Sequence, residues 1–157
     1  MKKLRVYVDT SVIGGCLDDE FKEWSKGLLA DFKRKVFIPV ISELTVREVA
    51  LAPISVRTVF MTFRRYAEAI VVPTIEMLTL ADAYLAKGIV TRTFADDALH
   101  IAIATIAEVD ILVSWNFKHI VHFDKIQRFN MINQEMGYTP IMIYSPREVT
   151  GYGNQGG

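Results

Sequence analysis

The feature of this sequence that most constrains its fold is a series of short apolar segments separated by longer segments with helical patterning. Strands are expected at residues 4–8, 36–40, 70–72, 110–114 and 141–144. These segments are short and apolar, which is typical of strands buried on both faces of a parallel sheet. Because parallel strands need crossover connections, we predict an α/β fold: a three-layer α/β/α sandwich with a central, mostly parallel sheet.

The segments between these strands carry helical patterns. Helices are expected at residues 18–35, 43–51, 54–69, 75–86, 93–107 and 124–136, with a short helix after Thr10–Ser11 and a last turn starting at Ser145. Ser42 is a suitable N-cap residue, and Thr93 followed three residues later by Asp96 resembles a capping box. The helix 93–107 is apolar nearly all round, which predicts a central, buried position.

Composition limits the class of protein. The chain has 157 residues, 51% of them hydrophobic, and its 18 Lys and Arg balance 18 Asp and Glu. This apolar content excludes intrinsic disorder, and the length predicts a single domain, residues 1–150, followed by a flexible tail, residues 151–157. The zero net charge weakens the case for a generally basic nucleic-acid-binding surface, so a function on nucleic acid would depend on a local site.

Neither a membrane protein nor a secreted one is expected. The longest apolar stretch, residues 98–113, is interrupted by polar and charged side chains, whereas a membrane-spanning helix needs about 20 apolar residues. The N-terminus lacks the long apolar region of a secretory signal. Cys16 is the only cysteine of the sequence, which excludes an internal disulfide and is best explained as a small buried residue. We therefore expect a cytoplasmic protein.

Polar side chains occur where strands of the predicted sheet end. Asp9 directly follows the first strand, Asn116 follows the fourth strand by two residues, and Asp97 lies in the first turn of the buried helix. Glu48 lies one and a half turns into the helix after the second strand. Ligands of parallel α/β sheets bind beyond the carboxyl ends of the strands, where the strand order reverses. We therefore expect these four side chains to converge at that edge.

Several carboxylates in one place repel one another unless they share a cation. Carboxylate oxygens suit Mg²⁺ or Mn²⁺, which retain several waters and need only one or two protein carboxylates. Asp9, Glu48 and Asp97 are the predicted ligands. A site of this kind can activate water and stabilise the charge that develops during displacement at a phosphate.

Each acid also has a structural explanation. Asp9 could cap the helix that follows it, although the two hydroxyl residues after it could do so instead. The helix dipole alone favours one acid of the Asp96–Asp97 pair, and Asp96 fits that role, which leaves Asp97 without a structural purpose. Glu48 stands among apolar neighbours in the sequence, where an acid needs a partner. Glu43 is explained as an acid of the first helical turn.

Other polar residues are weaker candidates. His100 lies three residues after Asp97, on nearly the same helix face. It could support a metal ion or carry a proton, although a histidine satisfied beside the core is the simpler interpretation. The remaining candidates are basic or aromatic residues for which a solvated face or packing is the simpler explanation: His119, His122, Arg57, Arg64, Arg65, Arg92, Lys118 and Trp115.

Four motifs occur in order along the chain. They are VYVDTSVIGG at Val6–Gly15, SELTVREV at Ser42–Val49, DDALHIAIA at Asp96–Ala104 and DILVSWNFKHI at Asp110–Ile120. Together they resemble the PIN-domain family, most closely the VapC-like toxins of toxin–antitoxin pairs, over about residues 4–149. The resemblance implies a Mg²⁺- or Mn²⁺-dependent endoribonuclease with a three-layer α/β fold. It also implies a homodimer and a small antitoxin that inserts into the active-site groove.

The resemblance assigns the first three acids of the family to Asp9, Glu48 and Asp97. The fourth position, which is often aspartate in the family, aligns with Asn116. An asparagine can ligate a metal through its carbonyl oxygen or hold a water, but it brings no negative charge. This departure weakens the case for a second metal ion and leaves the full nuclease activity open.

Two other functions fit the sequence. The first is a PIN-like scaffold with a weakened metal site that binds RNA or a protein without cleaving it, and Asn116 is the residue that favours it. The second is a phosphatase that uses Asp9 as a covalent nucleophile. The second fits less well, because Ser11 occupies the place of the second aspartate in the expected D-x-D pattern. The RNA target and the identity of an antitoxin stay open.

Overall fold

The structure, a computed structural model, describes residues 2–155. Five strands form one sheet in the order β3-β2-β1-β4-β5, and all four pairings are parallel. The strands are β1 (Arg5–Val8), β2 (Ile38–Ser42), β3 (Ile70–Val71), β4 (Ile111–Val113) and β5 (Met142–Tyr144). The predicted parallel sheet is therefore confirmed, with each strand within a few residues of its expected position.

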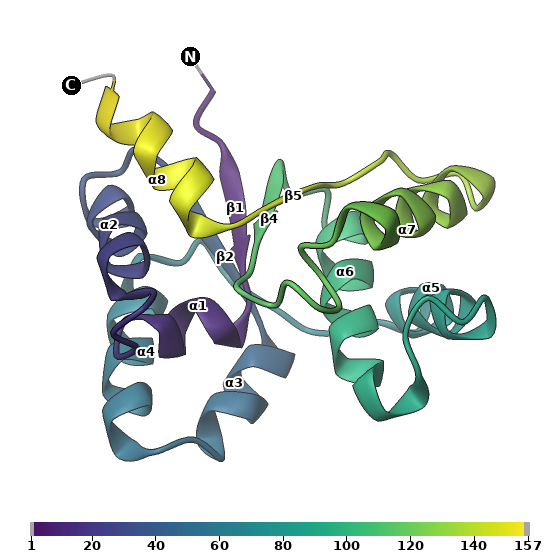
Figure 1. The fold of residues 1–157 in the computed structure, drawn as a ribbon, viewed down its shortest axis with the longest axis horizontal. Helices are drawn as coiled ribbons and strands as arrows, with labels where there is room; N and C mark the ends of the chain where they lie inside the picture. The colour runs from purple at the N-terminus through teal and green to yellow at the C-terminus, as the bar shows by residue number, and fades with distance from the viewer. Residues whose placement is uncertain (1, 156–157) are drawn as a thin grey trace.

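Helices cover both faces of the sheet, as Figure 1 shows. One face carries α1 (Thr10–Gly15), α2 (Lys22–Lys33), α4 (Ile54–Tyr66) and α8 (Pro146–Gln155). The other carries α5 (Ile75–Ala86), α6 (Ala95–Ile106) and α7 (Phe123–Glu135). The short α3 (Glu43–Ala50) continues from the carboxyl end of β2. This arrangement is the predicted three-layer α/β/α sandwich.

The central strand β1 faces two apolar cores, one on each side of the sheet. Successive side chains of a strand point to opposite faces, so Tyr7 packs with α5, α6 and α7 while Val6 and Val8 pack with α1, α2 and α4. All three side chains are fully buried. This burial on both faces explains why β1 is apolar throughout rather than alternating.

The strand order places a switch point between β1 and β4. The chain runs from β1 outward to β2 and β3, then returns across the sheet through α5 and α6 to β4. Connections on the two sides of this point lie on opposite faces of the sheet, and in parallel α/β sheets ligands bind at such a point, beyond the carboxyl ends of the strands. Asp9 follows β1 at this point, and Ser114 follows β4.

The start of α6 corrects one detail of the sequence analysis. Thr93 does not open a capping box, because a 3₁₀ turn over Arg92–Phe94 leads directly into α6. Phe94 is the N-cap residue and makes no side-chain capping bond. Ser42, by contrast, caps α3 as predicted, since its Oγ accepts a hydrogen bond from the backbone N–H of Thr45 at 3.4 Å.

The C-terminal helix is longer than the single turn that the sequence indicates. Within α8, Thr150 Oγ1 donates a hydrogen bond to Oδ2 of the buried Asp31 on α2, at 2.8 Å. The helix extends to Gln155, and residues 156–157 of the predicted tail lie outside the described residues. The division into a domain at 1–150 and a flexible tail at 151–157 stays a prediction. Within residues 2–155, no helix is long and apolar enough to span a membrane.

Candidate functional site

Asp9 lies at the switch point, almost fully buried with 4% of its surface exposed. Its Oδ1 accepts hydrogen bonds from Ser11 Oγ at 2.7 Å and from the backbone N–H of Val12 at 3.3 Å. Its Oδ2 accepts one from Ser114 Oγ at 2.6 Å. Asp9 therefore caps α1. Its carboxylate is also held by Ser114, which follows β4 on the other side of the switch point.

Glu48 reaches the site from α3. Its Oε1 accepts hydrogen bonds from Thr10 Oγ1 and shares one with His100 Nε2, each at 2.7 Å. Among the described residues, Oε2 of Glu48 has no hydrogen-bond partner. Glu48 is partly exposed, with 31% of its side-chain surface accessible. One carboxylate oxygen is thus fixed by protein groups and the other is available for a ligand.

His100 connects the acids to the interior of the domain. Its Nδ1 lies 2.7 Å from the hydroxyl of Tyr7, which in turn lies 2.7 Å from Ser42 Oγ. The imidazole is buried between this pair and Glu48. Burial lowers the pKa of His100, but the hydrogen bond with Glu48 and the negative charges of the three acids raise it by more, so the net pKa is raised.

Asp97 and Asn116 complete the cluster. Asn116 lies beside the carboxylate of Asp97 and acts to lower the pKa of that carboxyl group. Oδ1 of Asn116 accepts the backbone N–H of His119 at 2.9 Å, so the carbonyl oxygen is used within its own loop. The structure therefore brings Asn116 to the cluster, next to Asp97.

The four titratable groups influence one another electrostatically. Burial raises the pKa of Asp9, and His100 and the hydroxyl donors oppose this rise. Burial also acts to raise the pKa of Glu48, but its bonds with His100 and Thr10 lower it overall. The pKa of Asp97 is raised to about 6, because burial and the charges of Asp9 and Glu48 outweigh the effects of His100 and Asn116. The acids thus crowd negative charge into one place.

This crowding predicts that Asp97→Asn stabilises the ion-free protein. The pKa of Asp97 rises from 3.8 to about 6 on folding, so wild-type stability falls as pH rises through this window and stays low above it. An asparagine removes that cost, because it carries no charge at any pH in this range. Urea unfolding in EDTA should show a gain of about 1–2 kcal/mol at pH 7.5 that vanishes near pH 4. An equal or lower stability at pH 7.5 would contradict the crowding.

Several residues for which the sequence favours a structural explanation lie outside the cluster. Asp96 is exposed in the first turn of α6, where it suits the helix dipole, and Glu43 is exposed in the first turn of α3. His119 is buried against the ring of Phe94, with a centroid separation of 4.0 Å, and neither of its ring nitrogens has a hydrogen-bond partner among the described residues. His122 is exposed at the start of α7.

The acids do not form a ready coordination shell. Within residues 2–155, no three His, Cys, Asp or Glu side chains are placed together so that they could hold a metal ion. The carboxylates are close enough to shift one another's pKa values. Several of the carboxylate oxygens also accept hydrogen bonds from hydroxyl and imidazole groups. Because Mg²⁺ keeps several waters and binds through one or two carboxylates, this donor set still suits it.

Sequence reasoning missed the groups that hold the acids. Ser114 and Tyr7 were not candidates, although Ser114 Oγ binds Asp9 and the Tyr7 hydroxyl binds His100. His100 was considered a weaker candidate than the acids, yet it contacts Glu48 directly. One sequence feature points to such groups. A polar residue that ends or interrupts an apolar strand carries a buried hydroxyl, and a buried hydroxyl needs a hydrogen-bond partner.

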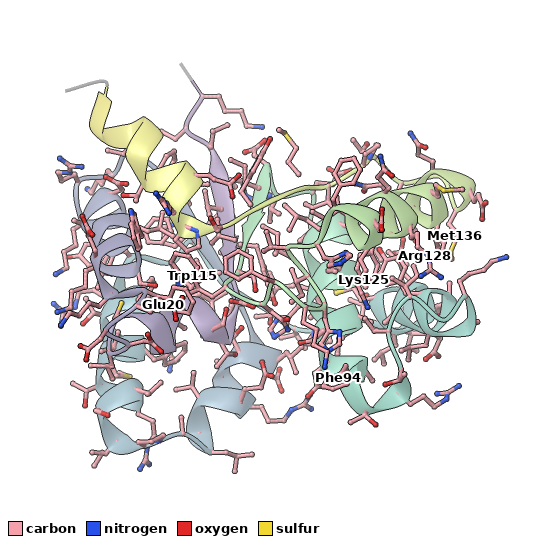
Figure 2. All side chains as sticks on the ribbon, in the orientation of Figure 1. Glu20, Phe94, Trp115, Lys125, Arg128 and Met136 are labelled. Atoms are coloured by element: carbon pink, nitrogen blue, oxygen red, sulfur yellow. The ribbon has the colours of Figure 1, made fainter. Side chains whose placement is uncertain are left out.

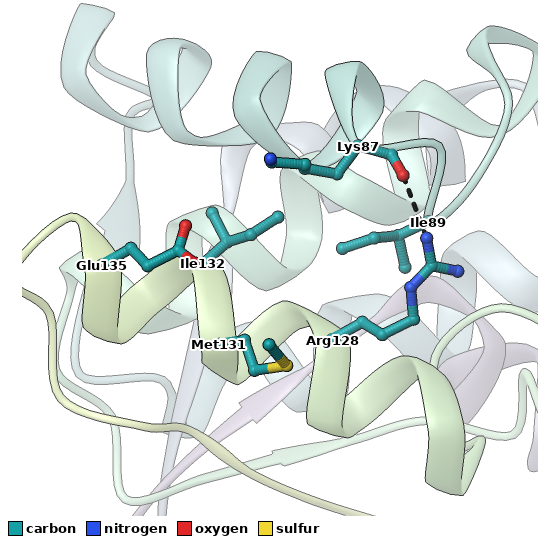
Figure 3. A pocket seen from close by; sticks show the side chains of 6 residues that line it. All are labelled: Lys87, Ile89, Arg128, Met131, Ile132 and Glu135. Atoms are coloured by element: carbon teal, nitrogen blue, oxygen red, sulfur yellow. Dashed lines mark hydrogen bonds between the residues drawn. The ribbon is translucent and has the colours of Figure 1, made fainter.

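A separate cavity lies between the loop after α5 and helix α7 (Figure 3). Its volume is about 200 Å³. The Arg128 side chain crosses one end and donates a hydrogen bond to the backbone oxygen of Lys87 at 2.9 Å. The lining residues are Lys87, Ile89, Arg128, Met131, Ile132 and Glu135. This cavity is formed by other elements than those that carry the acids.

Comparison with known proteins places the fold. No family model matches the chain, and no curated protein matches it. Among solved structures, the chain is similar to one in the crystal structure of VapBC2 from Rickettsia felis bound to a DNA fragment from their promoter. The TM-score is 0.59 at 13% identity, over 90% of this chain and 98% of that chain. The chain therefore has the PIN-like α/β/α fold that its sequence motifs predicted.

Proposed function

We propose that the protein is a Mg²⁺- or Mn²⁺-dependent endoribonuclease and the toxin of a toxin–antitoxin pair. The observation that carries the proposal is the convergence of Asp9, Glu48 and Asp97 at the switch point of the sheet, where burial and the charges of the other two acids raise the pKa of Asp97 to about 6. Crowded carboxylates with raised pKa values are typical of functional sites. The fold shared with a VapBC2 chain supports the class of protein.

Asp9, Glu48 and Asp97 would hold the ion, directly or through waters. When bound, the ion supplies positive charge against the phosphate and lowers the pKa of water. Ser11 and Ser114 each donate a hydrogen bond to a different oxygen of the Asp9 carboxylate, and Asn116 lies beside Asp97. With one oxygen of Glu48 bound to His100 and Thr10, its other oxygen can accept a proton from a water or hold that water in place.

The partners of this function are also proposals. An acidic pocket binds a phosphodiester through its cation, which is compatible with a net charge of zero. The structural neighbour is a VapBC2 assembly on DNA, which supports a small antitoxin as a partner of this chain. We further propose a homodimer that acts in the cytoplasm on RNA.

Removal of the metal tests the activity. Purified protein and a single-stranded RNA should give cleavage products in Mg²⁺ or Mn²⁺ and none in EDTA. A Glu48→Gln protein, purified in the same way as a control for contaminating nucleases, should cleave at least tenfold more slowly, since one ligand charge is lost. Cleavage that persists in EDTA, or at the same rate in Glu48→Gln, would contradict the proposal.

A second candidate function rests on Asn116. This residue adds no charge to the cluster, and its Oδ1 is occupied by the backbone of His119. A site with three acids rather than four would bind a single cation more weakly, so a module that binds RNA or a protein without cleaving it is the alternative. RNA binding without any cleavage in Mn²⁺ would favour this second function over the first.

A further inference from the structure

An aromatic cavity lies beside the acidic cluster, on the α1 and α2 face of the sheet. Its volume is about 400 Å³, which is within the range of small-molecule sites. Figure 2 shows Glu20 and Trp115 in this region, near α1 and the start of α8. The lining residues are Glu20, Phe21, Trp24, Trp115, Phe117, Ser145, Arg147 and Glu148. We call this the aromatic cavity.

The back of the aromatic cavity is rigid. Trp115 stacks on Phe21 with a centroid separation of 4.2 Å and an interplanar angle of 16°. Its indole N–H donates to Ser25 Oγ at 2.8 Å, which fixes the plane of the ring. Gly15 permits this position, because a Cβ there would lie 2.7 Å from the indole nitrogen. The wall is thus set before any ligand arrives, which lowers the entropic cost of binding.

The front of the aromatic cavity is open. Phe117 leaves 48% of its surface exposed although it lies beside the Trp115 ring, at 6.1 Å between centroids. The guanidinium of Arg147, an exposed residue, lies 5.0 Å from the centre of the Trp24 ring. An exposed aromatic ring next to a cation and a cavity can stack a planar ligand. These groups are the elements of sequence-tolerant single-strand recognition.

The aromatic cavity is directly linked to the acids. The backbone N–H of Trp115 donates to Ser11 Oγ at 2.9 Å, and the same hydroxyl donates to Asp9. Asn116, which lies beside Asp97, stands between Trp115 and Phe117 in the chain. The loop after β4 thus carries the exposed Phe117 ring one residue beyond the residue beside the acids.

We propose that the aromatic cavity is a nucleobase-binding subsite for single-stranded RNA, next to the phosphate that the acids act on. This inference rests on the proposed function for its substrate class. The base stacks on Phe117, and Arg147 supplies positive charge for a neighbouring phosphate. Glu20 and Glu148 disfavour a phosphate inside the cavity and can accept hydrogen bonds from ring and amino N–H groups of a base.

Intrinsic fluorescence tests the proposal without a label, because the two tryptophans of the chain, Trp24 and Trp115, both line the aromatic cavity. A four-nucleotide RNA of mixed sequence is titrated in EDTA at fixed salt, and a tetramer of abasic ribonucleotides is the comparison ligand. The RNA should quench the fluorescence to saturation. The abasic tetramer should bind roughly tenfold more weakly and quench little, since stacking contributes mainly through the base.

Two leucine variants separate the subsite from general effects. Phe117→Leu keeps an apolar side chain but removes the ring, and should weaken RNA binding roughly tenfold. Phe123→Leu makes the same change at another exposed phenylalanine, 74% accessible on α7, and should bind as wild type does. Arg147→Gln, a change at an exposed residue, should weaken binding and lower its salt dependence. Equal affinity of Phe117→Leu, or of the abasic tetramer, would overturn the proposal.

The same titration distinguishes a failure of the subsite from a failure of the proposed nuclease activity. Binding is measured in EDTA and does not depend on cleavage. RNA binding in this cavity without any cleavage in Mg²⁺ would therefore support the subsite and contradict only the proposed nuclease activity. Cleavage of RNA in Mg²⁺ at equal rates by wild type and Phe117→Leu would contradict only the subsite. A peptide of acidic and aromatic residues that quenches both tryptophans at lower concentration than RNA would assign the cavity to a protein partner and overturn the proposal.

Discussion

Asp9→Asn should lose RNA cleavage by about a thousandfold, which corresponds to about 4 kcal/mol of transition-state stabilisation. Asp9 is the most deeply buried of the three acids, and a buried carboxylate contributes a full negative charge to a cation in a region of low dielectric constant. The amide keeps an oxygen for the donors Ser11 and Val12 but removes the charge. The loss is measured as the initial rate of RNA cleavage in Mg²⁺.

Two controls belong to this experiment. Asp96→Asn makes the same chemical change at an exposed acid next to Asp97 and should cleave within twofold of wild type. Asp9→Asn should also remain folded, because burial already raises the pKa of Asp9 and its ionised form therefore costs stability. Thermal unfolding checks this point. Wild-type cleavage by a folded Asp9→Asn protein would contradict the assignment of Asp9.

Gly15→Ala should lower the free energy of unfolding by about 2–3 kcal/mol. A Cβ at this position would lie 2.5 Å from Ser25 Oγ and 2.7 Å from Trp115 Nε1, so it would separate two atoms that hydrogen bond to each other. Both partners are buried, so neither side chain can move away without opening the core around Phe21. Urea unfolding monitored by tryptophan fluorescence measures the loss.

Gly14→Ala provides a matched control one residue earlier in α1. A Cβ at Gly14 would meet no atom within 4 Å, and alanine is favoured over glycine inside a helix by about 0.5–1 kcal/mol. Gly14→Ala should therefore be neutral or stabilising. An equal loss of stability in both variants would contradict the close approach of Gly15 to Trp115. It would also contradict the rigid wall of the aromatic cavity, which depends on that approach.

Much of the fold could be predicted from the sequence because its signals are local. The strands around Tyr7 and Leu112 are runs of buried apolar residues, and helical segments between consecutive strands are the crossover connections that a parallel sheet needs. Once strand neighbours are assumed, the convergence of Asp9 and Asp97 follows from topology, since strand ends and helix starts of such a sheet share one edge. Glu48 can be predicted as a site residue because a charged side chain among apolar neighbours needs a partner.

The rest of the site depends on contacts between distant segments. The bond between Tyr7 and His100 spans 93 residues, and that between Asp9 and Ser114 spans 105. No spacing rule connects such pairs. The Thr93 capping box was wrong for a related reason, because the 3₁₀ turn before α6 lets Phe94 precede the helix without a polar cap.

Asn116 illustrates how position and role differ. The sequence could place it at the carboxyl edge of the sheet, and the structure does so. Its role depends on which atom faces the cluster, and the backbone N–H of His119 takes its carbonyl oxygen. Asn116 therefore lies beside Asp97 with this oxygen already occupied. A sequence cannot reveal this orientation, because it is set by the fold of the loop after β4.

The central claim is that the three carboxylates at the switch point hold one divalent cation, directly or through waters. Electron paramagnetic resonance of free Mn²⁺ during a protein titration measures that binding directly, independently of any RNA. Wild type and Asp96→Asn should remove Mn²⁺ from solution with the same affinity, and Asp9→Asn should bind it at least tenfold more weakly. Wild-type protein that leaves Mn²⁺ free, or Asp9→Asn protein that binds it equally well, would contradict the account.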